Sequence, residues 1–405
     1  MTKNSLLFVI SKLLGLILTF FTTALVARHL SVAEFGLYSI VKVVFSFVFV
    51  ISCVVNDAYI ISEMKDNPKN VVIINFIRHL LYILLSVIIF FYFDNNIIVI
   101  SIMALYFFQL SNLGVARLNF SNSGKLILLI NISSLFISLM ISYFIYIYSH
   151  EMIISLLIVL PLFYFLLQVF CLFFTDVRKF YFLFLYRFKS SEIKENLLSV
   201  WPILITSLLI LAYTRVDYIV ISYYLTKIDL GIYAVSGQIS EPFSFAISAY
   251  ASSIIIKIKS IDDVEERNRY ISSQLKYVHL YSIVLCIMFY FFGQYFISVF
   301  FGDKYLSSYI PAFILLFGKI FVFSNLFFSF IMIIDSKYKV RMVRTFYGII
   351  VNIILNFILI PLFGIIGAAV ATSLSQLITL TIINYCSVQT RDYFYVFINS
   401  FRLGK

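Results

Sequence analysis

Long apolar stretches dominate this chain, and they limit it to one kind of fold. A helix of about 20 apolar residues crosses the hydrocarbon core of a bilayer. The chain is 62% hydrophobic and 12% charged over 405 residues, which leaves little sequence for a soluble domain. Twelve spans are predicted: 5–27, 36–60, 71–93, 96–116, 126–148, 152–174, 197–224, 231–256, 275–301, 306–334, 343–361 and 364–388. We therefore expect an all-α integral membrane protein.

A nine-residue motif repeats at half the chain length and suggests two related halves. Leu30–Tyr38 and Leu225–Tyr233 both read L-[ST]-x-x-[ED]-[FL]-G-[LI]-Y, and both lie in short gaps between apolar runs. Paired halves in secondary transporters place the substrate path at their interface. The sequence predicts a six-helix bundle over 1–174, a cytoplasmic interfacial linker over 175–196, and a second six-helix bundle with a cytoplasmic tail over 197–405.

The distribution of Lys and Arg predicts the orientation in the membrane. With the N-terminus in the cytoplasm, 23 of the 30 basic residues lie in cytoplasmic loops or at the cytoplasmic ends of spans, 3 lie on the opposite side and 4 lie deeper inside spans. The 23 include Arg78, Lys276 and Arg344, which stand at span ends. This bias follows the positive-inside rule and predicts that both termini lie in the cytoplasm. The net charge of +11 is therefore a topology signal rather than a nucleic-acid-binding face.

The motifs of soluble enzymes are missing from the sequence. There is no G-x-x-x-x-G-K-[ST] loop for ATP, and the four His residues stand apart from one another. The four Cys residues are scattered singly through apolar segments and are predicted to be small core residues. We expect no enzymatic activity, no cofactor and no metal.

Charged residues inside the predicted spans are the candidate functional residues. Each costs at least ~2.5–3.5 kcal/mol on insertion scales, so each requires a physical reason. The residues are Lys12, Lys42, Asp57, Arg215, Asp217, Glu241 and Lys319. All except Lys319 lie on spans 5–27, 36–60, 197–224 and 231–256, and they would line one shared cavity if the halves pack through these helices. The alternative is that those near span ends extend to the membrane surface or are simply solvated.

Three of these residues carry further information. Arg215 and Asp217 are two residues apart, so they point to different sides of a helix. Glu241 lies near the middle of its span and is followed by Pro242, which disrupts the hydrogen-bond ladder and favours a kink beside a cavity. A carboxylate in that place suits reversible protonation.

Neutral polar and small residues are predicted to hold helices together. The polar ones are expected to form interhelical hydrogen bonds; they are Asn112, Gln168, Gln238, Asn325, Asn352, Asn356 and Gln376. The small residues of 364–372 favour close helix contact over ligand binding.

These features together resemble a known transporter family. The motifs are the two repeated hairpins, Trp201-Pro202, Phe301-Gly302-Asp303-Lys304-Tyr305, and the run from Pro361 to Ala369. In this order they resemble the O-antigen-unit flippases (Wzx type), in the polysaccharide transport family of the multidrug/oligosaccharidyl-lipid/polysaccharide (MOP) superfamily. The resemblance covers essentially the whole chain.

The resemblance implies two six-helix bundles around a central cavity. It also implies translocation of an undecaprenyl-pyrophosphate-linked oligosaccharide, the repeat unit of O-antigen or lipopolysaccharide biosynthesis, from the cytoplasmic to the periplasmic leaflet. Its partners would be that lipid, membrane lipids, a polysaccharide polymerase and a chain-length regulator. We expect Lys12, Lys42 and Arg215 to bind the pyrophosphate, and Glu241, Asp217 and Asp57 to bind a coupling ion.

Three alternatives remain open at this point. A drug or cation antiporter of the same superfamily would favour an acidic cavity, whereas the spans hold four cations and three carboxylates. A peptidoglycan-precursor flippase would have two further helices. A polysaccharide polymerase would have a long external loop carrying arginines.

Overall fold

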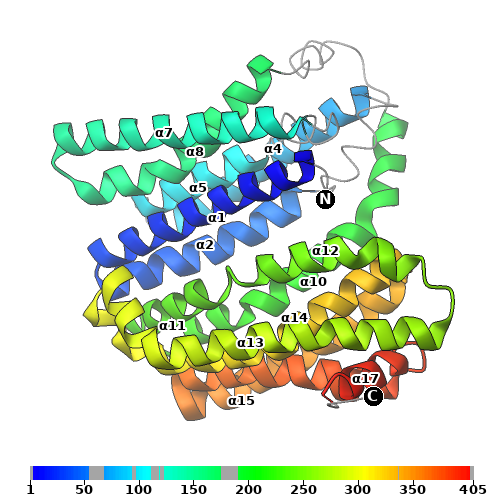
Figure 1. Cartoon of the computed structure of the whole chain (residues 1–405). Coiled ribbons are helices and arrows are strands. Elements are labelled where there is room, and N and C mark those ends of the chain that lie inside the picture. The colour runs from blue at the N-terminus through cyan, green and yellow to red at the C-terminus, as the bar shows by residue number, and fades with distance from the viewer. Residues whose placement is uncertain are drawn as a thin grey trace. The chain divides into compact units, whose positions relative to one another are not determined.

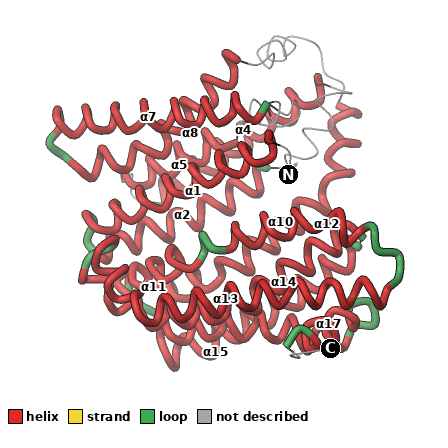
Figure 2. The backbone as a smooth tube through the Cα atoms, viewed as in Figure 1, coloured by secondary structure: helices red, strands yellow, loops and turns green. Residues whose placement is uncertain are grey.

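Helices joined by short loops make up the described part of the protein. The computed structural model describes residues 3–53, 68–93, 97–110, 118, 123–174, 190–335 and 337–401, and no strand occurs within them (Figure 2). In those residues, eight helices are long and apolar enough to cross a membrane, and two shorter apolar helices span Ile77–Tyr92 and Ile97–Leu110. The prediction of an all-α membrane protein is confirmed.

The first six predicted spans each coincide with a helix. The bounds are α1 Lys3–His29, α2 Val32–Ser52, α4 Pro68–Tyr92, α5 Ile97–Leu110, α7 Gly124–Ser149 and α8 Met152–Phe174. The last residues predicted for the spans of α2 and α5, Asn112 among them, lie outside the described residues.

The last six predicted spans correspond to the remaining helices. These are α10 Ser190–Tyr224, α11 Lys227–Ser240, α12 Ser244–Lys259, α13 Val264–Phe300, the 3₁₀ helix η2 Asp303–Ser308, α14 Tyr309–Ile334, α15 Tyr338–Ile378, the π-helix η3 Thr379–Ile383, α16 Asn384–Cys386 and α17 Arg391–Asn399.

One predicted span is interrupted at a proline, and two predicted spans meet at a glycine. The span predicted over 231–256 is two helices, because Pro242 has no N–H to continue the ladder and the chain turns after Glu241. Within α15, Gly364 has φ 59° and ψ −140°, a conformation that favours glycine. The chain folds back there, so that a Cβ on Gly367 would lie 2.1 Å from the Leu359 carbonyl oxygen. The predicted small-residue contact after Gly364 is thus confirmed.

The chain forms two compact units whose bounds differ from the predicted halves. The first unit is Met1–Leu30 with Val41–Leu211, and the second is Ser31–Ile40 with Ala212–Lys405. Residues 190–196, predicted as linker, belong to α10, a continuous helix that carries the chain from the first unit into the second. The repeated motif at Ser31–Ile40 belongs to the second unit, because it packs against its own copy there.

The first unit is a bundle in which α8 contacts α1, α5 and α7, while α4 packs on α5 (Figure 1). Its core contains Leu18, Ile127, Leu160 and Phe163. Side chains bond between neighbouring helices, as when Ser101 donates to the Leu157 carbonyl at 2.6 Å. Such bonds satisfy polar groups that lipid cannot.

Helix α14 is the centre of the second unit. It contacts α11, α12, α13 and α15, and α17 packs on α13 (Figure 1). Aromatic residues of α14 form much of the core, including Phe323, Phe327 and Phe328, which are almost completely buried. Polar side chains of α14 reach two of these neighbours, since Ser324 and His279 of α13 share a hydrogen bond and Asn325 donates to Gln376 of α15.

The repeated motif has a double structural role, of which the first is helix capping. In the first copy, the Ser31 N–H donates to Glu34 at 2.8 Å and the Glu34 N–H donates to the Ser31 hydroxyl at 3.2 Å. In the second copy, Thr226 and Asp229 form the same reciprocal pair, at 3.1 and 3.2 Å. The [ST]-x-x-[ED] pattern is therefore a capping box that starts α2 and α11.

The second role is a close contact between the two copies. A Cβ on Gly36 would lie 2.0 Å from the Lys227 carbonyl oxygen, and one on Gly231 would lie 2.2 Å from that of Val32. Phe35 of the first copy meets Tyr305 edge to face at 5.8 Å. Three of the sequence motifs thus converge at one place in the second unit.

We predict that Gly36→Ala destabilises the protein by about 1–3 kcal/mol, because the added methyl group overlaps a backbone oxygen that cannot move independently. Thermal unfolding in detergent, followed by size-exclusion chromatography, measures the effect. Gly15→Ala is the matched control, since no described atom lies within 4 Å of a Cβ there. Equal melting temperatures for the two variants would contradict the contact.

Candidate functional site

The predicted charged residues fall into two groups by unit. In the first unit, Lys12 is exposed on α1, and Lys42 is half-buried on α2, where its carbonyl accepts a bond from Tyr106 at 3.3 Å. Asp57 lies outside the described residues. The remaining charges, Arg215, Asp217, Glu241 and Lys319, all lie in the second unit, and they form one cluster.

Arg215 and Glu241 form a two-pronged ion pair at the break between α11 and α12. Arg215 Nη1 donates to Glu241 Oε1 at 2.6 Å, and Nη2 donates to Oε2 at 3.1 Å. The side chains are 27% and 44% exposed. The break ends α11 at this carboxylate, and the side chains of both partners stay partly exposed there.

Asp217 points away from this ion pair into the protein, as the two-residue spacing predicts. It is 5% exposed, and the Tyr233 hydroxyl donates to it at 2.5 Å. Tyr233 belongs to the second copy of the repeated motif. Tyr218 packs edge to face on Tyr233 at 5.4 Å and places its ring 5.5 Å below the Arg215 guanidinium. The buried carboxylate therefore anchors the helix segment that presents Arg215.

Lys319 adds a second cation to the cluster from α14. Its side chain is 8% exposed, and it attracts Glu241 and repels Arg215. Glu241 thus interacts with two cations, one partly exposed and one buried. An ion pair with a spare cation can exchange partners without leaving a buried charge uncompensated.

The structure also shows two buried arginines that were not among the charged residues predicted to lie deep inside spans. Arg78 on α4 and Arg344 on α15 are almost completely buried, although both were counted on the cytoplasmic side. Each lies within a predicted span, 71–93 for Arg78 and 343–361 for Arg344, and this position could have indicated burial. Arg344 Nη2 donates to Asn325, which itself donates to the Gln376 side chain at 2.8 Å.

Several predicted polar contacts between helices are confirmed. Gln168 donates to the Phe108 carbonyl, and Asn352 donates to Ser375 at 2.9 Å. The network of Asn325 and Gln376 joins α14 to α15. These side chains act as interhelical connections, separate from the charged cluster around Glu241.

The Arg215–Glu241 pair makes a measurable prediction about stability. Each single Ala variant removes the same two-pronged ion pair, so the two losses overlap and the double variant is less destabilised than their sum. Partial exposure limits the coupling energy to about 1 kcal/mol. Thermal unfolding of the four proteins in detergent measures the cycle, and strictly additive effects would contradict the pair.

Known proteins share both the sequence pattern and the fold. The family described as "Polysaccharide biosynthesis protein" matches residues 25–310. The Capsular polysaccharide biosynthesis protein CapF of Staphylococcus aureus is 24% identical over 257 residues, which cover 60% of this chain and 62% of CapF. The matched stretch is therefore less than two thirds of that relative.

Solved transporters share the fold across nearly the whole chain. The lipid II flippase MurJ, in an inward closed conformation, has a TM-score of 0.71 at 19% identity and covers 98% of this chain and 90% of its own. An inward-facing multidrug resistance transporter of the MATE family, in the MOP superfamily, has a TM-score of 0.61 at 10% identity, with 96% and 93% covered. The chain is therefore a multi-pass membrane protein that belongs to the polysaccharide biosynthesis protein family and has the fold of the MOP superfamily.

Proposed function

We propose that this protein is a flippase that moves an undecaprenyl-pyrophosphate-linked oligosaccharide from the cytoplasmic to the periplasmic leaflet by alternating access. Its family and the capsular polysaccharide name of its relative support a polysaccharide precursor. The lipid II flippase with the same fold supports a lipid-linked substrate. O-antigen or another surface polysaccharide would be the final product.

The charged cluster of the second unit is the observation that carries this proposal. Arg215 and Glu241 are partly exposed near mid-span, where lipid-facing charges are strongly unfavourable. Charges in such a position belong beside a water-filled route. The cluster holds Arg215 and Lys319 against Glu241 and the buried Asp217, so its charges balance. Release of Glu241 would leave the Arg215 guanidinium to bind an anionic headgroup.

In the proposed mechanism, Arg215 exchanges Glu241 for the substrate pyrophosphate. A guanidinium binds phosphate oxygens through two parallel hydrogen bonds, as it now binds the carboxylate. Lys12 and Lys42 add positive charge from the first unit. The polyprenyl tail stays in the bilayer while the headgroup crosses.

Release of Glu241 provides the coupling step. The freed carboxylate either pairs with Lys319 or takes up a proton or a sodium ion, together with Asp217 or Asp57 as a further carboxylate. Binding the ion would bias the equilibrium between inward-open and outward-open states. Transport by this route changes no covalent bond of the substrate, so no catalytic residue or cofactor is required.

The orientation follows the charge bias of the loops. We propose that the protein resides in the bacterial inner membrane with both termini in the cytoplasm. The two capped hairpins would then lie at the periplasmic face. A polysaccharide polymerase and a chain-length regulator would act on the delivered unit there.

Arg215→Ala should abolish export, because the pyrophosphate loses the guanidinium that compensates its charge. Arg215→Lys should retain part of the activity, since a lysine supplies the charge without the two parallel bonds. Surface polysaccharide is measured in cells that produce each variant at the same level. Lys259→Ala, an exposed position at the end of α12, is the charge-matched control and should export normally. Normal polymer in Arg215→Ala cells would contradict the phosphate role.

Glu241→Gln should retain substrate binding while transport loses its response to an ion gradient, because the amide has no titratable proton. Purified protein in liposomes, with an imposed pH or sodium gradient, measures flipping of a lipid-linked oligosaccharide. An unchanged response to both gradients would exclude Glu241 as the coupling residue.

Deletion of the gene in its host tests the function as a whole. A flippase deletion should stop polymer formation and leave complete oligosaccharide units on the cytoplasmic leaflet. Intact polymer with raised drug accumulation would instead identify a cation antiporter.

A further inference from the structure

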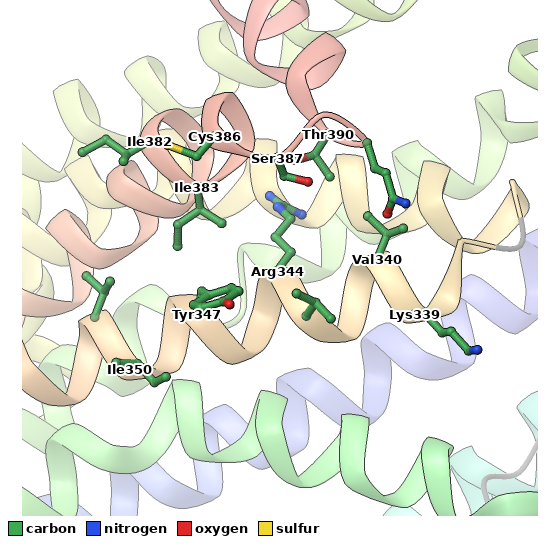
Figure 3. Close-up of a pocket in the computed structure, with 13 residues that line it drawn as sticks. Lys339, Val340, Arg344, Tyr347, Ile350, Ile382, Ile383, Cys386, Ser387 and Thr390 are labelled. Carbon is green, nitrogen blue, oxygen red and sulfur yellow. The ribbon is translucent and has the colours of Figure 1, made fainter.

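We propose that a groove at the start of α15 binds an anionic phospholipid, with its phosphate at Arg344 and Lys339 and one acyl chain along the apolar end. The groove has a volume of about 500 Å³ and lies between α15 and the segment from η3 to the start of α17 (Figure 3). This site is separate from the Arg215–Glu241 cluster and does not rest on the proposed transport function.

The lining of the groove divides into a polar end and an apolar end. Figure 3 shows Arg344 pointing between Ile383 and Ser387, with Lys339 toward the beginning of the helix. Farther along α15, the lining consists of apolar side chains, opposite Ile382 on η3. From Lys339 to Val351 the helix advances about 18 Å, which suits a headgroup followed by part of an acyl chain.

The charge of the polar end selects an anion. Two cations line the groove, and no Asp or Glu is among the described residues that do so. Arg344 is 5% exposed, and its Nε has no hydrogen-bond partner among the described residues, although Nη2 binds Asn325. A buried donor left without an acceptor is costly, so a phosphate oxygen at Nε would stabilise this arrangement.

The apolar end is suited to a hydrocarbon chain. Val343, Tyr347 and Ile350 on α15 are 48%, 53% and 38% exposed, and Ile382 across the groove is 58% exposed. Exposed apolar side chains of a membrane-spanning helix contact lipid chains rather than water. The groove thus combines an open apolar wall with a cationic end, as an amphipathic lipid requires.

The predicted orientation identifies the leaflet. The start of α15 carries Lys337, Lys339, Arg341 and Arg344 and is assigned to the cytoplasmic side. Anionic phospholipids are the natural ligands of basic pockets on that side. We commit to a phospholipid rather than the polyprenyl carrier.

Cys386 lines the groove and is exposed, so its thiol reports occupancy directly. Cys171 and Cys286 are buried, and Cys53→Ser removes the remaining partly accessible thiol. The rate of labelling with a small maleimide is measured in detergent micelles with added phosphatidylglycerol, phosphatidylcholine or undecaprenyl phosphate. Phosphatidylglycerol should slow labelling about fivefold more than phosphatidylcholine.

Matched variants assign the effect to the groove. Lys339→Ala should require about fivefold more phosphatidylglycerol for the same protection. Lys337→Ala makes the same charge change two residues earlier, outside the lining, and should leave protection unchanged. Arg344→Ala should weaken protection further, provided that thermal melting shows the variant to be folded.

Native mass spectrometry tests the apolar end of the groove. Ile382→Trp should lose bound phosphatidylglycerol, whereas Ile354→Trp, which changes an exposed isoleucine outside the groove, should retain it.

Selective protection by phosphatidylglycerol that Lys339→Ala weakens and Lys337→Ala does not would support the site. Equal protection by phosphatidylcholine, or no protection by any lipid, would overturn it. Stronger protection by undecaprenyl phosphate than by phosphatidylglycerol would also overturn it, since the occupant would then be the carrier lipid.

Discussion

Inside a bilayer no water is present to bond the backbone, and this constraint shapes the whole chain. Each segment must satisfy its own N–H and C=O groups, so most of the described residues form helices. The helical hydrogen-bond ladder is interrupted at Pro242, which has no N–H, and at Gly364, which has a positive φ. Polar side chains obey the same constraint. They pair across helices, as Asn325 does with Gln376, or they gather where a helix breaks, as Glu241 does.

The repeated hairpin shows how one short motif meets several needs of a membrane bundle. Its polar residues cap the helices, which satisfies N–H groups that the ladder leaves unpaired. The glycine of each copy lets the two backbones approach so closely that a methyl group on either glycine would overlap a carbonyl oxygen of the other copy. Tyr233, the last residue of the second copy, holds the buried Asp217 behind Arg215. The duplicated hairpin is thereby linked to the charged cluster through one hydrogen bond.

Two arginines of the second unit illustrate how exposure separates different uses of one side chain. Arg215 is partly exposed, and its partner Glu241 is more exposed still, so the pair is open to competition from a phosphate. Arg344 is buried and fixed to Asn325, which makes its guanidinium the rigid end of a groove. The first arrangement suits a ligand that must be released, and the second suits one that stays bound.

The sequence by itself determined the helical class, the approximate places of the spans and most of the charged residues inside them. Hydrophobicity and charge are properties of local sequence, and the insertion of a segment into a bilayer depends on them directly. The sequence also indicated that Arg215 and Asp217 face different ways. Only the tertiary structure decided which charges meet. Helix packing pairs Arg215 with Glu241 and places Lys319 near both. It also buries Arg344 and brings Gly36 against Gly231. Packing brings together residues that are 26 to 195 positions apart, and no local pattern encodes such distances.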